Sequence, residues 1–65
     1  MRADLFRLMC QRFNSTEVAG RITDRVIEEA GHGEQNVRDY LRKNLEFTNP
    51  VIEEIIDILF HPRCA

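Results

Sequence analysis

Only two cysteines, Cys10 and Cys64, occur in the 65 residues of this chain. Two cysteines are too few for the framework of several disulfides that stabilises many small secreted domains. We therefore expect both to be reduced thiols and the protein to be cytoplasmic.

Long apolar runs and an excess of basic charge are also missing. No stretch approaches the ~20 apolar residues of a membrane span, and the apolar patch between Arg2 and Arg7 is too short for a signal peptide. Nine basic and eleven acidic residues give a net charge of −2. This balance excludes a basic field over the whole protein, of the kind that attracts nucleic acid.

Strand signals are absent as well, and helical spacing takes their place. No segment alternates apolar and polar residues over the length of a strand, and no Asn-Gly or Asp-Gly hairpin turn occurs. Apolar residues instead recur three and four positions apart. The pattern predicts a single all-α domain over residues 1–65, a compact bundle of four short helices at about 4–13, 15–30, 34–45 and 49–60, with a frayed tail at 61–65.

The boundary between the first two helices carries the clearest local signal. Asn14 is predicted to cap the second helix, and Glu17 can reach back to it as in a capping box. Phe13 and Val18 occupy the two positions of a hydrophobic staple. After the second helix, Gly31 is expected in the left-handed conformation that often ends a helix.

The densest apolar run in the sequence lies at residues 51–60, after two possible caps, Thr48 and Asn49, between which the pattern does not decide. At ~100° per residue, the apolar side chains of this helix cover an arc of roughly 200°. The rest of the circumference is occupied by three acids, Glu53, Glu54 and Asp57. An ordinary surface helix carries an apolar stripe nearer ~100° wide, so we expect this arc to exceed what three short neighbours can cover.

An uncovered arc of this width predicts a protein partner. We expect a non-enzymatic interaction or regulatory module that binds another protein chain or, most simply, pairs with itself as a homodimer. The candidate partner-binding residues are Ile52, Ile55, Ile56, Leu59 and Phe60.

Catalytic and metal-binding patterns are weak. The chain has two histidines, no nucleophile elbow, and no strand to precede a glycine-rich phosphate loop, so we expect no enzyme, no cofactor and no small-molecule substrate. Four residues could in principle supply zinc ligands, namely Cys10, His32, His61 and Cys64. Since Cys10 has no second ligand close to it in the sequence, we expect no metal site and a small apolar role for its thiol.

Residues 24–41 suggest a second hypothesis. Their spacing resembles the helix-turn-helix of lac-repressor-type regulators, with Ala30 and Gly31 at the turn and Val37 and Tyr40 facing inward. The resemblance implies a transcriptional regulator whose second helix enters the major groove, where Arg suits guanine and Asn or Gln suits adenine. The implied DNA-binding residues are Gln35, Asn36, Arg38, Arg42 and Lys43. The acidic net charge favours the interaction module over this alternative.

Overall fold

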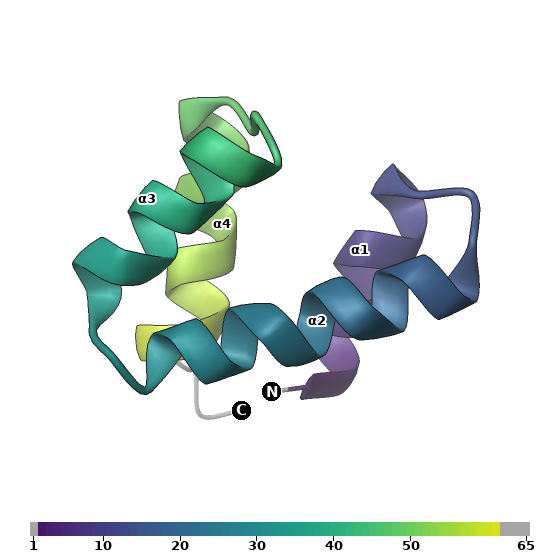
Figure 1. Cartoon of the computed structure of the whole chain (residues 1–65), viewed down its shortest axis with the longest axis horizontal. Helices are drawn as coiled ribbons and strands as arrows, with labels where there is room; N and C mark the ends of the chain where they lie inside the picture. Colours follow the sequence, from purple (N-terminus) through teal and green to yellow (C-terminus); the bar gives the residue numbers. More distant parts are fainter. Residues whose placement is uncertain (1, 62–65) are drawn as a thin grey trace.

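A computed structural model of the chain describes residues 2–61, which form four α-helices (Figure 1). The helices are α1 (Arg2–Arg12), α2 (Thr16–Ala30), α3 (Glu34–Asn44) and α4 (Asn49–Phe60). No strand occurs in this part of the chain, so the all-α prediction is confirmed, and each helix begins and ends within two residues of its expected position. Of the expected frayed tail, residues 62–65 lie outside the described residues.

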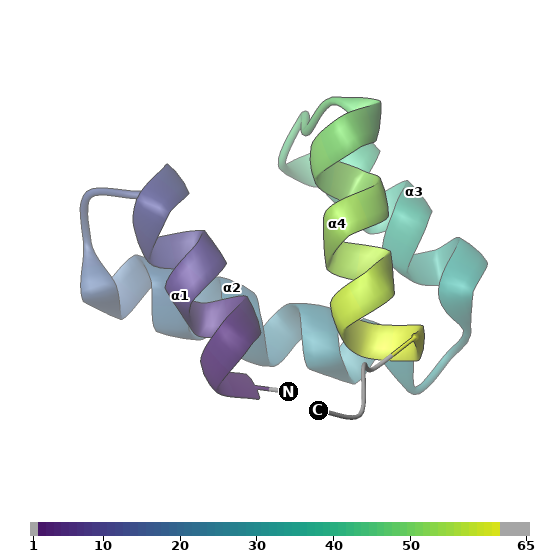
Figure 2. The same ribbon diagram turned by 180° about the vertical axis from the view of Figure 1, so that it is seen from behind.

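The longest helix, α2, forms the base on which the others are arranged. In Figure 1, α1 packs along one end of α2, while α3 and α4 rise together from the other end. Sequential helices are neighbours in space, and α4 also approaches α1, which closes the bundle. Seen from behind, α4 stands between α1 and α3 (Figure 2). The central position of α4 explains why so much of its circumference is apolar.

One hydrophobic core holds the four helices together. Its buried members come from every helix: Leu5, Leu8, Met9, Ala19, Val26, Val37, Leu41, Val51, Ile52, Ile55 and Ile56. The single buried polar residue among those described is Thr23, whose hydroxyl donates a 2.7 Å hydrogen bond to the carbonyl of Ala19. Because that bond satisfies the hydroxyl, Thr23 can stay in the core without the cost of an unpaired polar group.

Three of the four isoleucines of α4 belong to this core, which corrects the expectation that they need a partner chain for cover. Ile52, Ile55 and Ile56 are 1%, 0% and 1% exposed. The prediction treated the neighbouring helices as too small to cover an arc of this width. In the fold, α3 packs on one side of α4 and α1 approaches the other, so the arc is enclosed on several sides at once.

The start of α2 also differs from the prediction. Its N-cap is Ser15, whose Oγ accepts a 3.3 Å hydrogen bond from the amide of Val18, so the predicted cap at Asn14 is wrong by one residue. With Ser15 as the cap, the predicted staple between Phe13 and Val18 does not form, because Val18 is 43% exposed. Phe13 instead lies against Phe47 of the loop before α4, with ring centroids 6.2 Å apart.

The turn between α2 and α3 places its left-handed residue later than predicted. Gly31 has φ −66° and continues the right-handed helix, while Gly33 has φ +112° and directly precedes α3. Its ψ of 162° completes a conformation that is open almost only to glycine. At α4 the choice between two caps is decided for Thr48, and Asn49 is the first residue of the helix.

Candidate functional site

The last turn of α4 holds the two predicted partner-binding residues that are only partly buried, Leu59 and Phe60. Ile58, Leu59 and Phe60 pack against the core but are only partly buried, whereas Ile55 and Ile56, one turn earlier, are enclosed. We call these three residues the α4 end. Two of them, Leu59 and Phe60, were expected as contacts from the sequence; Ile58 was not, although the apolar run contains it.

Carboxylates line the outer side of α4. Glu53, Glu54 and Asp57 are all exposed, but Glu53 is engaged by an arginine of α3. Glu54 lies one helical turn before Ile58, and Asp57 lies one turn before Phe60. The three residues of the α4 end follow one another in the helix and so point about 100° apart, with acidic side chains beside Ile58 and Phe60.

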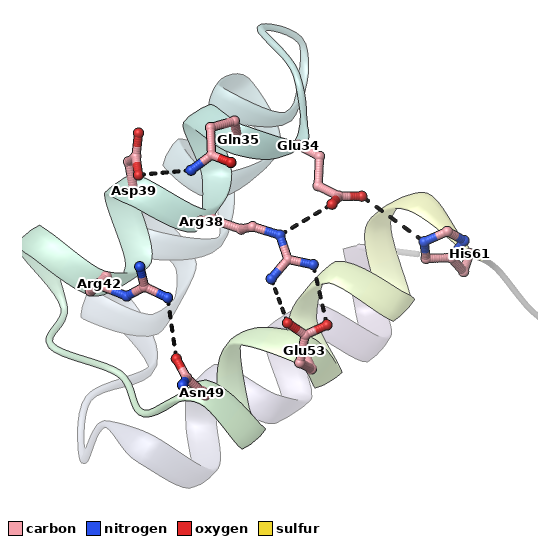
Figure 3. A network of polar contacts seen from close by, with 8 residues as sticks. All are labelled: Glu34, Gln35, Arg38, Asp39, Arg42, Asn49, Glu53 and His61. Atoms are coloured by element: carbon pink, nitrogen blue, oxygen red, sulfur yellow. Dashed lines mark hydrogen bonds and ion pairs between the residues drawn. The ribbon is translucent and has the colours of Figure 1, made fainter.

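Arg38 links α3 to α4 through two carboxylates (Figure 3). Its Nε donates to Glu34 Oε2 over 3.1 Å. Its two terminal nitrogens face the two oxygens of Glu53, and the bond from Nη2 to Oε1 measures 3.2 Å. Such a two-pronged contact is the geometry in which an arginine holds a carboxylate best. His61 Nε2 lies 4.0 Å from the other oxygen of Glu34, at the edge of the same network.

These contacts shift the ionisation of both partners. The hydrogen bonds from Arg38 hold the pKa of Glu53 below its usual range, although burial of the carboxylate acts in the opposite direction. Reciprocally, the hydrogen bond to Glu53, followed by the one to Glu34, raises the pKa of Arg38. Arg38 and Glu53 are thus both charged at neutral pH, and their ion pair links the two helices.

The predicted DNA-binding residues divide between two faces of α3. Arg38 is turned toward α4, with 24% of its side chain exposed, and Arg42 donates to Asn49 Oδ1 over 3.2 Å. Gln35 donates to Asp39 Oδ1 over 3.0 Å and so lies beside a carboxylate on the outer face (Figure 3).

The other two predicted DNA contacts, Asn36 and Lys43, are exposed, and the Asn36 side-chain amide donates to the carbonyl of His32 over 3.2 Å. The structure therefore does not bring these five side chains together on one free surface. The contact that sequence reasoning missed is the one between Arg38 and Glu53, which are fifteen residues apart.

An open hollow of about 300 Å³ lies between α2 and α3. Its lining is polar and contains Arg25, Glu29, Asn36, Asp39, Tyr40, Lys43 and Asn44. Arg25 binds Glu29 over 3.3 Å, and its guanidinium also covers the ring of Tyr40, with its carbon 5.7 Å from the ring centroid. Two cations and two anions share the lining, so the hollow selects for neither sign of charge.

Metal-ligand geometry is missing from residues 2–61, where no three or more His, Cys, Asp or Glu side chains gather closely enough to hold an ion. Cys10 is a half-buried free thiol in α1, while Cys64, the other candidate ligand, lies outside the described residues. No helix in this part of the chain has the length and apolar character needed to cross a membrane.

Comparison with known proteins adds no relative: no protein-family model, curated protein or solved structure matches this chain.

Proposed function

We propose that this chain is a non-enzymatic protein-interaction or regulatory module whose contact surface is the α4 end. The observation that supports this proposal is the partial exposure of Ile58, Leu59 and Phe60, in a chain that encloses the rest of the apolar face of α4. Phe60 is the natural anchor, because aromatic side chains that fill a partner's pocket contribute a large share of binding energy at interfaces. A cytoplasmic location is part of the proposal and rests on the low cysteine content.

The size of the surface sets the strength that we expect. A stable interface of standard size takes about 800 Å² from each partner. The whole chain exposes 4524 Å², and the α4 end is one helical turn of it. The contact is therefore expected to be small and of micromolar affinity or weaker, as is common for regulatory encounters. A second copy of the chain is the simplest partner to examine first.

Site-directed photo-crosslinking in cells of the source organism tests this proposal for any protein partner. A photoreactive phenylalanine analogue replaces Phe60 in one variant and Val18, the exposed apolar residue on the opposite part of the chain, in a matched control. We expect a crosslinked product, with a second copy or with another protein, from position 60 and none from position 18. Absence of a product from position 60, or equal products from both, would overturn the proposal.

The exposed side of α3 supports a second candidate, the helix-turn-helix DNA-binding regulator. Gln35, Asn36, Arg42 and Lys43 are exposed on a helix that follows α2 after a three-residue turn. This reading predicts retention of duplex DNA in a gel-shift assay at low salt, lost steeply as salt is added. Replacing both Arg42 and Lys43 with alanine should abolish retention while the fold persists. A chain that retains no duplex at low salt would exclude the reading.

A further inference from the structure

We propose that the contact between Arg38 and Glu53 is autoinhibitory, because the carboxylate of α4 occupies a guanidinium of α3 that would otherwise bind a phosphate of duplex DNA. The inference rests on the second candidate function, the helix-turn-helix regulator, and adds a restraint on it. It follows from the atoms of Arg38 that are engaged and from the strip of α3 on which this arginine lies.

All three guanidinium nitrogens of Arg38 are engaged by carboxylates of the same chain (Figure 3). Nε donates to Glu34 Oε2 over 3.1 Å. Nη1 and Nη2 face the two oxygens of Glu53, with Nη2 3.2 Å from Oε1. A two-pronged contact of this kind is also the one that an arginine makes with a phosphate. Glu53 therefore takes the place at Arg38 that a phosphate would need.

Arg38 lies on a strip of α3 that also carries Gln35 and Arg42. Residues three and four apart share a face of a helix, so the side chains at positions 35, 38 and 42 follow one another along it. Arg42 is also turned toward α4, since it donates to Asn49 Oδ1 at the start of that helix over 3.2 Å. Released from α4, the strip would present two guanidinium groups and one amide, the groups that bind phosphates and base edges.

The restraint is strong at Arg38 and weak at Arg42. The side chain of Arg38 is only 24% exposed and is held by two carboxylates, whereas Arg42 is exposed and its partner Asn49 is neutral. Hydrogen bonds between two charged groups are stronger than those to a neutral amide. A phosphate can therefore bind Arg42 directly, but it has to displace Glu53 to reach Arg38.

An ion pair that only stabilises the fold makes a different prediction. In that case, removing the charge of Glu53 changes DNA affinity no more than removing any other exposed acid does, through the net charge alone. In an autoinhibitory contact the same change also adds one phosphate contact. Glu54 is the matched comparison, because it is exposed and is the next residue along the same helix.

Fluorescence-anisotropy titration of a labelled duplex of mixed sequence with the full chain tests the inference at several salt concentrations. Glu53→Gln and Glu54→Gln each raise the net charge by one. We expect Glu53→Gln to bind about fivefold more tightly than the wild-type chain at low salt, the effect of one charge pair. Its plot of log affinity against log salt concentration should be steeper by about 0.9, the value of one added phosphate contact, whereas Glu54→Gln should keep the wild-type slope.

Arg38→Ala in two backgrounds shows whether the gain comes through this arginine. In the Glu53→Gln background it should remove the gain. In the wild-type chain it should weaken binding no more than Arg21→Ala, a charge-matched control whose arginine pairs with Glu17 on α2. Circular dichroism checks that each variant is folded, and if Arg38→Ala unfolds, the two salt slopes decide. Arg63, outside the described residues, is present in every chain compared, so its charge cancels.

Contrary results separate the inference from the function on which it rests. Equal affinities and equal salt slopes for Glu53→Gln and Glu54→Gln would overturn the inference and leave the helix-turn-helix candidate in place. A larger loss from Arg38→Ala than from Arg21→Ala in the wild-type chain would do the same, because Arg38 would then already contact the DNA. If no chain in the series binds the duplex at low salt, the inference and the helix-turn-helix candidate fail together.

Discussion

Replacing Ile55 with alanine should be among the most destabilising changes in α4. The side chain is 0% exposed and lies in the middle of the helix, surrounded by the core. The substitution removes three carbon atoms, and at about 0.8 kcal/mol per buried carbon the lost transfer energy is about 2.4 kcal/mol. The cavity left behind adds to this, so we expect a total loss of about 3 to 4 kcal/mol.

This loss is large for so small a domain. A chain of this length has a free energy of unfolding of about 3 to 10 kcal/mol. A loss of 3 kcal/mol lowers the Tm of such a domain by about 12 to 24 °C. Ile55→Val keeps most of the side chain, so it should cost only about 1 kcal/mol. The valine variant should therefore stay folded even where the alanine variant unfolds.

Thermal and urea unfolding followed by circular dichroism measure these values, and Ile58→Ala is the matched control. Ile58 lies on the same helix but is only partly buried, so the same substitution there should cost clearly less. Below the concentrations at which the α4 end would pair with a second copy, the Tm of the wild-type chain should not change with protein concentration, because the core is closed within one chain. The reasoning is refuted if both isoleucine variants lose the same stability, or if Tm rises with concentration and Ile55→Ala removes that rise.

Other substitutions test the local features of the fold, each by urea denaturation. Arg38 lowers the pKa of Glu53 in the folded chain. The stabilisation from their contact is therefore fully present above the pKa of Glu53 in the unfolded chain, about 4.3, and is lost as the pH falls through the lower folded pKa. Glu53→Gln should accordingly cost more stability at pH 7 than at pH 3. Ser15→Ala removes the cap of α2 and should cost about 0.5 to 1 kcal/mol, a smaller loss than for a cap with a shorter hydrogen bond. Gly33→Ala should cost about 1 to 3 kcal/mol from backbone strain alone. Gly20→Ala, where the added carbon meets only ordinary contact distances, should instead stabilise α2 by up to about 1 kcal/mol.

Errors in the sequence reading arose where neighbouring residues are chemically equivalent. Asn14 and Ser15 both cap helices well, and the fold uses Ser15. Gly31 and Gly33 can both adopt left-handed conformations, and the structure uses only Gly33 for this.

The candidate site was predictable only in part. The apolar run pointed to Leu59 and Phe60, but it gave the same weight to Ile52 and Ile55, which the fold encloses. Periodicity shows which side of a helix is apolar, and it does not show where along the axis the neighbouring helices stop covering it. That boundary depends on how α1 and α3 are placed against α4.

The sequence by itself determined the four helices and, to within two residues, their limits, because the spacing of apolar residues and the turn residues between them are local properties of the chain. Only the tertiary structure decided which apolar side chains remain exposed and that Arg38 binds Glu53, fifteen residues away. A helical repeat fixes the direction of a side chain relative to its own helix. What that side chain meets is set by the packing of helices that are distant in sequence.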